Sequence, residues 1–127
     1  GPTDFTRMNQ AGSQMDHDAP DSPESQLIGG PVQQNKEKAA RANPITYVSR
    51  DDPPFLILHG DQDPLVPVQQ SELLHEALRK AGVNCIYHVL RGAGHGGASF
   101  NTPEINRMVR DFFSRHLKPG QPATAPK

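Results

Sequence analysis

The sequence predicts an α/β fold, in which parallel strands are flanked by helices. Residues 54–58 form an uninterrupted apolar run, which suits a strand covered on both faces better than a strand with one wet face. Apolar residues then recur at helical spacing over residues 68–81, and a second β-prone run covers residues 84–90. Strand, helix and strand in this order predict a right-handed crossover that joins two parallel strands.

The composition indicates one domain with a modest hydrophobic core. Hydrophobic residues make up 34% of the 127 residues and aromatic residues only 6%, whereas there are 13 prolines and 11 glycines. Such a balance favours an ordered centre with irregular flanks. We expect a domain over residues 1–118, irregular over residues 1–21, where Phe5 and Met8 could hold it to a surface. Residues 119–127 are expected to form a disordered tail.

Charge and apolar patterning argue against two classes of partner. The net charge is −1 and no block of lysine and arginine occurs, so the chain has no field that would attract nucleic acid or anionic lipid. No apolar stretch approaches the ~20 residues that a membrane span needs. We therefore expect neither nucleic acid nor a membrane as a partner. The single cysteine cannot form an internal disulfide, which leaves the redox compartment, and so the localisation, open.

Two short helices are expected before the central strand. Ser22-Pro23-Glu24 has the pattern of a helix start, with a hydroxyl cap, a proline in the first turn and an acidic residue. Gly29-Gly30 would end that helix. A second, polar helix is expected over residues 32–42, followed by a short β-prone stretch over residues 45–48.

The elements after the central strand have the clearest patterns. Gly60 would let the backbone turn as the strand ends, and Pro67 is expected to open the next helix. That helix, over residues 68–81, should end at Gly82, which is placed for a left-handed cap. The final helix is expected to begin at residues 102–104. Its buried face would comprise Ile105, Met108, Val109, Phe112, Phe113 and Leu117.

Two polar residues that follow the two expected strands should meet. Asp63 comes after the first strand, and His95 comes after the second strand in a glycine-rich loop. Because neighbouring parallel strands end at the same edge of a sheet, both side chains should face each other across a small gap. A carboxylate that fixes the tautomer of a histidine and stabilises its protonated form is two-thirds of a hydrolytic triad. The alternative, that both residues only cap turns, stays open at this point.

Two loops carry a resemblance to the α/β-hydrolase superfamily. The stretch HGDQDPLVP at residues 59–67 resembles the acid loop of that superfamily, and GAGHG at residues 92–96 resembles its histidine loop. Within the superfamily, the chain is similar to the esterase/lipase branch, which includes prolyl-oligopeptidase-like, feruloyl and acetyl esterases. Residues 1–5, 22–30 and 43–55 are also similar to that branch, so the resemblance extends over residues 1–118.

The resemblance implies the C-terminal part of an α/β-hydrolase domain, an incomplete three-layer αβα sandwich that acts on a small-molecule ester without a cofactor or a metal. It implies that Asp63 is the triad acid and His95 the general base. In that superfamily the nucleophile precedes both residues in the chain.

The nucleophilic serine is expected to be missing from this chain, together with the oxyanion-hole segment. No Gly-x-Ser-x-Gly elbow occurs in the sequence, and no serine sits at a turn between an expected strand and an expected helix. The serines are Ser13, Ser22, Ser25, Ser49, Ser71, Ser99 and Ser114.

Other candidate residues have simpler explanations. His59 is expected to anchor the end of the strand, and Asp61, the main rival for the acid role, could instead bond loop amides. Cys85 is expected to be a small core residue, because nothing in the sequence places a base beside it. His17, between two aspartates, is expected to be a solvated turn residue. No ligand spacing on one rigid element supports a metal site built from His59, Asp61, Asp63 and His95.

Three functions therefore remain open: a carboxylester hydrolase that receives its acid and histidine from this chain, a catalytically inactive fragment that serves folding or partner binding, and a metal-assisted hydrolase. The strand at residues 54–58 should also have an open edge away from residues 84–90, where a further parallel neighbour is expected. We expect self-association through this edge, or pairing with a missing N-terminal half supplied as a separate polypeptide.

Overall fold

The computed structural model describes residues 1–10 and 13–117, so the tail expected over residues 119–127 lies outside the described residues. The strands are β1 (Phe55–Gly60) and β2 (Cys85–Leu90). The α-helices are α1 (Pro23–Ile28), α2 (Lys36–Ala42), α3 (Gln69–Lys80) and α4 (Pro103–His116). Short 3₁₀ helices span Phe5–Gln10, Val32–Gln34, Pro44–Tyr47 and Ala98–Phe100.

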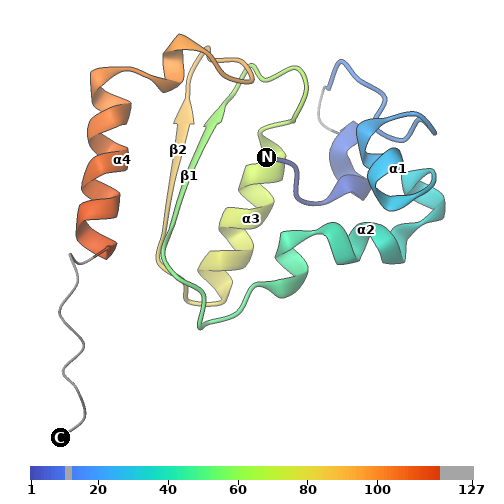
Figure 1. Cartoon of the computed structure of the whole chain (residues 1–127), viewed down its shortest axis with the longest axis horizontal. Coiled ribbons are helices and arrows are strands. Elements are labelled where there is room, and N and C mark those ends of the chain that lie inside the picture. The colour runs from blue at the N-terminus through green and yellow to red at the C-terminus, as the bar shows by residue number, and fades with distance from the viewer. Residues whose placement is uncertain (11–12, 118–127) are drawn as a thin grey trace, which may run out of the picture.

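β1 and β2 form the predicted parallel pair, and α3 connects them (Figure 1). The register places Phe55 opposite Cys85 at one end and Gly60 opposite Leu90 at the other. β1 extends past the predicted end at residue 58, because the ladder with β2 continues to Gly60. Both strands therefore end together, at the edge where the loops that follow them meet.

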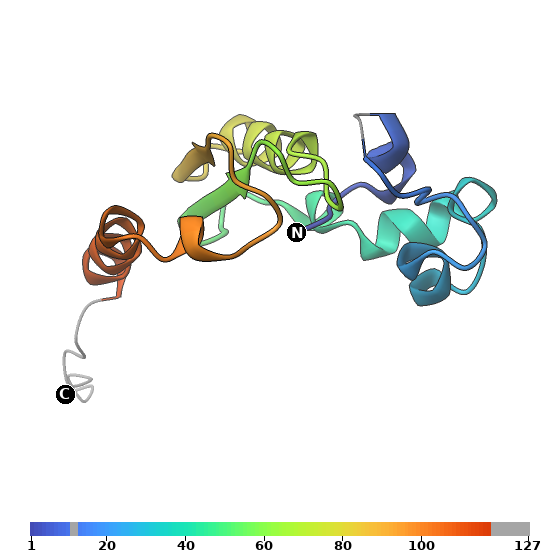
Figure 2. The ribbon, with the colours of Figure 1, turned by 90° about the horizontal axis from the view of Figure 1, so that it is seen from above.

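Helices cover both faces of this small sheet (Figure 2). On one face, Leu78 of α3 packs with Ile57 of β1. On the other face, Ile105 of α4 packs with Leu90 and Ala93, and Leu58 joins them. Successive residues of a strand point to opposite faces, which is why neighbouring residues of β1 serve two different clusters. The arrangement is a partial α/β fold.

A third apolar cluster holds the N-terminal segment against the loop that follows β1. In this cluster Met8 is completely buried and Phe5 nearly so, and they hold the segment to the rest of the chain as the sequence analysis allowed. The described part of the segment expected to be irregular over residues 1–21 thus contains the 3₁₀ helix Phe5–Gln10. The cluster comprises Phe5, Met8, Ile28, Val32, Ala39 and Val66.

Two elements between α1 and β1 differ from the prediction. The helix expected over residues 32–42 is a 3₁₀ turn followed by α2, because Asn35 leaves the helical conformation and its side-chain amide donates to the Pro31 carbonyl at 2.9 Å. The β-prone stretch at residues 45–48 is a 3₁₀ helix instead of a strand. The Asn43 side chain accepts a hydrogen bond from the Ile45 amide at 2.9 Å, so local capping decides its conformation.

Glycine and proline positions around the strands also refine the prediction. α3 begins at Gln69 and not at Pro67, whose carbonyl closes a turn with the Gln70 amide. Gly82 adopts the predicted left-handed conformation with φ 79°. Gly60 is needed for a different reason from the predicted turn: an added Cβ would lie 2.3 Å from the carbonyl oxygens of Ala93 and Gly94.

The buried face predicted for α4 is wrong over its second half. The helix begins at the predicted place, with Thr102 as its cap, and Ile105 is buried. Phe113 and Leu117 are 51% and 64% exposed, because only the first turns of α4 reach the cluster on the sheet. No helix in the described part of the chain is both long and apolar enough to cross a lipid bilayer.

Candidate functional site

Asp63 and His95 lie together beyond the carboxyl ends of the two strands. The Nδ1 atom of His95 is 2.9 Å from Oδ2 of Asp63. The structure thus brings together the two residues that the sequence analysis selected, one from each loop. Since Nδ1 is bound to a carboxylate, it carries the proton, and Nε2 is the nitrogen that can accept one.

The Asp63 carboxylate is fixed by the backbone of its own loop. Its Oδ1 accepts hydrogen bonds from the amides of Leu65 and Val66, both at 2.9 Å, and the side chain is only 4% exposed. Burial by itself would raise the pKa of this carboxyl. The bonds from the Val66 amide, His95 and the Leu65 amide outweigh that effect and hold the pKa below its ordinary value. Asp63 is therefore an ionised, pre-oriented acceptor for an imidazole.

His95 is the accessible member of the pair. Its side chain is 54% exposed, and glycines 94 and 96 on either side leave the imidazole clear of its own loop. A small hollow of about 70 Å³ lies beside the pair, with apolar walls from Leu58, Val66 and Phe100. An exposed imidazole over a small hollow can transfer a proton to or from a bound molecule.

His59 anchors the site, as predicted. The ring is 4% exposed, Nε2 donates to the Val66 carbonyl at 2.9 Å, and Nδ1 accepts from the Ser71 hydroxyl at 2.5 Å. Nε2 is also 3.3 Å from Oδ2 of Asp63. The histidine therefore links the end of β1, the acid loop (residues 61–67) and α3, which keeps the Asp63 carboxylate in place.

Asp61 bonds a loop amide, which was the alternative to an acid role. Its Oδ1 accepts a hydrogen bond from the Gly92 amide at 2.7 Å. Among the described residues, the carboxylate that contacts His95 is that of Asp63. Asp61 instead ties the acid loop to the loop that carries the histidine, and so helps to fix the distance between them.

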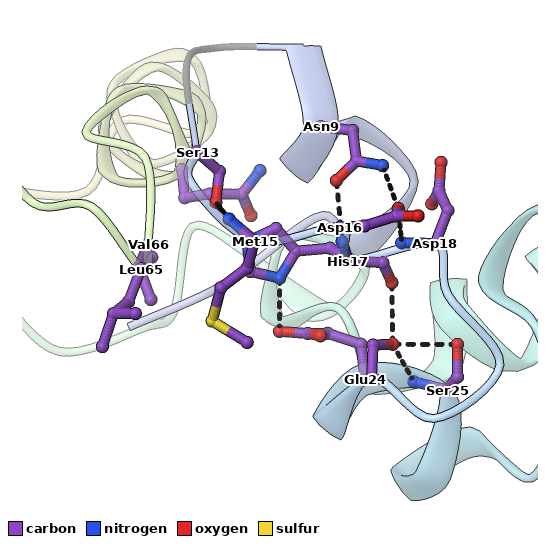
Figure 3. A network of polar contacts seen from close by, with 12 residues as sticks. Asn9, Ser13, Met15, Asp16, His17, Asp18, Glu24, Ser25, Leu65 and Val66 are labelled. Atoms are coloured by element: carbon purple, nitrogen blue, oxygen red, sulfur yellow. Dashed lines mark hydrogen bonds and ion pairs between the residues drawn. The ribbon is translucent and has the colours of Figure 1, made fainter.

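The prediction for His17 is wrong, and with it a buried polar network was missed. His17 is 2% exposed instead of solvated. Its Nε2 lies 2.7 Å from the Ser13 hydroxyl, and its Nδ1 lies 3.0 Å from Oε1 of Glu24 at the start of α1 (Figure 3). In the sequence, this network appears only as several polar residues before a helix. Such residues usually cap the helix or lie in solvent, so the pattern did not indicate a buried histidine.

Cys85 has a basic neighbour that the sequence did not indicate. Nδ1 of His75, on α3, lies 3.4 Å from the Cys85 sulfur. Burial raises the pKa of the Cys85 thiol, so the sulfur stays protonated and donates weakly to the imidazole. The pair is consistent with the predicted core role for Cys85.

Three serines of the described segments lie within a helix or cap one. Ser22 caps α1, and Ser71 lies within α3, bonded to His59. Ser99 lies in the 3₁₀ helix Ala98–Phe100. Within residues 1–10 and 13–117, no group of three or more His, Cys, Asp or Glu side chains is arranged to hold a metal ion.

Comparison with known proteins shows the family to which the chain belongs. The family model BD-FAE matches residues 1–78. Esterase LipQ of Mycobacterium tuberculosis is 40% identical over 76 residues, which cover 60% of this chain and 18% of LipQ. A truncated form of a carbohydrate esterase from gut microbiota superposes with a TM-score of 0.81 at 30% identity, over 91% of this chain and 40% of that one.

A further solved structure, a bifunctional GH43-CE protein of Bacteroides eggerthii, superposes with a TM-score of 0.80 at 37% identity. It is matched over 91% of this chain and 14% of its own length. The chain thus spans less than a fifth of the length of LipQ and of this bifunctional protein.

Proposed function

Because the chain belongs to the BD-FAE family of α/β-hydrolases, we propose that it supplies the acid and the histidine of a serine carboxylester hydrolase. One observation carries the proposal, namely the 2.9 Å contact between Asp63 Oδ2 and His95 Nδ1. The names of the relatives, esterase and carbohydrate esterase, support the ester-hydrolysing class.

In the proposed reaction, His95 is the proton carrier. Nε2 takes the proton of a serine hydroxyl as that oxygen attacks the ester carbonyl, and returns it to the departing alcohol. A water molecule then releases the acid by the same route. Asp63 keeps Nδ1 protonated and stabilises the imidazolium that forms in each step. We place the nucleophilic serine outside these 127 residues, because no serine elbow occurs among them.

We propose a short acyl group as the substrate class. The hollow beside the pair has a volume of about 70 Å³. A hollow of this size has room for a small group only, so it suits an acetyl group better than a long chain. Its apolar walls would hold the methyl group of such an ester, while the carbonyl faces the imidazole.

A chimaera tests the proposal. Residues 1–117 of this chain replace the matching region of the gut carbohydrate esterase, whose remaining part supplies the preceding elements. The chimaera is expected to hydrolyse an aryl acetate and to lose this activity after treatment with a serine-reactive phosphonate. His95→Ala should lower kcat/KM by about 10²–10⁴, as expected for loss of a general base, and Asp63→Asn should lower it in the same direction.

Asp51→Asn is the matched control, since that carboxylate is exposed in the turn before β1 and belongs to neither loop of the site. A folded chimaera whose hydrolysis does not change in His95→Ala would contradict the proposal. Turnover by the unfused chain that a chelator abolishes would favour the metal-assisted alternative.

An assembly role is the second candidate, favoured by surfaces that the described chain leaves open. β1 pairs with β2 along one edge, and no other described strand pairs with it. Phe113 and Leu117 of α4 are largely exposed. We propose that the free edge of β1 joins a second copy of this chain, or a separate polypeptide that carries the missing N-terminal half.

A further inference from the structure

His17 lies in a buried polar network in which its backbone and its ring Nε2 make hydrogen bonds, whereas Nδ1 approaches Glu24 without making one. The backbone amide of His17 donates to the Asn9 side chain and its carbonyl accepts from the Ser22 hydroxyl, both at 2.8 Å. The ring lies between Ser13, at 2.7 Å, and Glu24, at 3.0 Å (Figure 3). A histidine that makes three hydrogen bonds at 2% exposure fixes the segment around it relative to α1.

This network ends on the acid loop. The Gln14 amide donates to the Pro64 carbonyl at 3.0 Å, and the Ser13 hydroxyl lies 3.4 Å from the same oxygen. Pro64 directly follows Asp63 in the chain. The path therefore runs from α1 through Glu24 and His17 to Ser13, and from there to the peptide next to the proposed triad acid.

The peptides on either side of this contact decide where the Asp63 carboxylate points. Its Oδ1 is held by the amides of Leu65 and Val66, which follow Pro64, while Oδ2 faces His95. A rotation of the Pro64 peptide would move both amides and turn the carboxylate with them. The His95 ring is more than half exposed, so little packing holds it, and its contact with Asp63 depends on the direction of the carboxylate.

The row of Ser13, His17 and Glu24 could have either of two functions. As in a catalytic triad, Ser13 could be a nucleophile, or the three residues could orient the acid loop. However, the Ser13 oxygen already accepts the Met15 amide at 3.1 Å. Ser13 also lines neither the hollow beside His95 nor the pocket of about 180 Å³ that adjoins the acid loop. The contacts favour a role in orientation.

We propose that Ser13 and His17 are positioning residues, which orient the Asp63 carboxylate toward His95 through the Pro64 carbonyl. The inference rests on the proposed function, because it concerns the same acid and histidine. It extends that function to a segment that precedes the acid loop by about fifty residues in sequence. It also makes a prediction about His95 that a purely structural network does not make.

The test reads the ring nitrogens of His95 in the 127-residue chain by long-range ¹H–¹⁵N NMR. In the unaltered chain, His95 is expected to carry its proton on Nδ1, hydrogen-bonded to Asp63. Ser13→Ala should reduce the ratio of the Nδ1–H to the Nε2–H tautomer about fivefold, the effect of losing one hydrogen bond. Glu24→Gln should change it in the same direction, and Ser13→Thr, which keeps a hydroxyl, should restore it.

Thr6→Val is the matched control. It removes a side-chain hydrogen bond of the same N-terminal segment, from the Thr6 hydroxyl to Asp4 at 2.6 Å, and should leave the His95 tautomer unchanged. An unchanged tautomer in Ser13→Ala, with only a lower melting temperature, would overturn the proposal in favour of a structural role. Labelling of Ser13 by a serine-reactive phosphonate would overturn it in favour of a nucleophile.

Failure of the proposed function has a different signature. In that case the chimaera shows no hydrolysis that depends on His95, although the chain retains the His95–Asp63 bond and its dependence on Ser13. Absence of that bond in the unaltered chain would overturn both proposals.

Discussion

At the scale of single residues, the site depends on a carboxylate whose surroundings favour its charge. Two backbone amides and an imidazole bind Asp63, and together they lower its pKa against the effect of burial. Because the pKa in the folded chain lies below that of the unfolded chain, the unfolded chain takes up a proton first as the pH falls. The stabilisation is thus complete above the unfolded value and is lost as the pH falls through the folded value.

Replacing Asp63 by asparagine should therefore flatten the acid side of the stability curve. At pH 7, Asp63→Asn should lower the free energy of unfolding by about 1–3 kcal/mol, since charge-assisted hydrogen bonds are replaced by neutral ones. Below about pH 4 the difference from the unaltered chain should shrink. Urea unfolding at several pH values measures this, and a difference that stays constant down to pH 2 would show that the charge of Asp63 contributes nothing.

Gly60 is a second residue whose replacement should lower the stability, because there is no room for a side chain at this position. In Gly60→Ala the new methyl group would meet two carbonyl oxygens of the histidine loop at 2.3 Å, so that loop must move. We expect a loss of about 1–3 kcal/mol, typical of overpacking. Gly94→Ala is the control, because a Cβ there meets open space. Equal thermal stability of the two variants would refute this account of the strand end.

At the scale of elements, sequence patterns predicted the helices and strands that have long apolar repeats. The apolar run before His59 predicted β1, the amphipathic repeat predicted α3, and the β-prone run at residues 84–90 predicted β2. Because the two strands are parallel, these elements also predicted that Asp63 and His95 meet. The patterns failed where a hydrogen bond of one side chain decides the backbone conformation. The Asn35 side chain interrupts the helix expected over residues 32–42, and the Asn43 side chain favours a 3₁₀ helix where a β-prone stretch was expected. They also could not reveal His17, because its partners belong to separate turns.

Helix α4 shows the limit of periodicity, since an apolar repeat does not specify its partner. Ile105 is 4% exposed and should cost about 2–4 kcal/mol when replaced by alanine. Phe113, 51% exposed on the same repeat, should cost less than about 0.5 kcal/mol when replaced by serine. Paired chemical unfolding of the two variants measures this, and a large loss in Phe113→Ser would mean that a partner covers that face in solution.

At the scale of the whole molecule, the open edge of β1 is the basis of the proposed association. Among the described residues, each of the two parallel strands has an outer edge without a strand partner, and the edge of β1 is the one that we propose to pair. An apolar strand edge of this kind pairs readily with another chain.

Light scattering from micromolar to millimolar concentration tests this association. The average mass of the chain is expected to rise with concentration, and Leu56→Lys on β1 should reduce the rise by placing a charge beside the edge. Lys80→Ala, a change at an exposed position of α3, serves as the control. A single monomeric mass throughout the range would contradict the proposed edge pairing.

The relation between Asp63 and His95 is tested most directly by the ring nitrogens of His95 in the unaltered chain and in Asp63→Asn. We expect a proton on Nδ1, shifted downfield by its bond to the carboxylate, and its loss in Asp63→Asn, where the ring returns to the Nε2–H form. A His95 ring that already carries its proton on Nε2, or that does not respond to Asp63→Asn, would contradict the account.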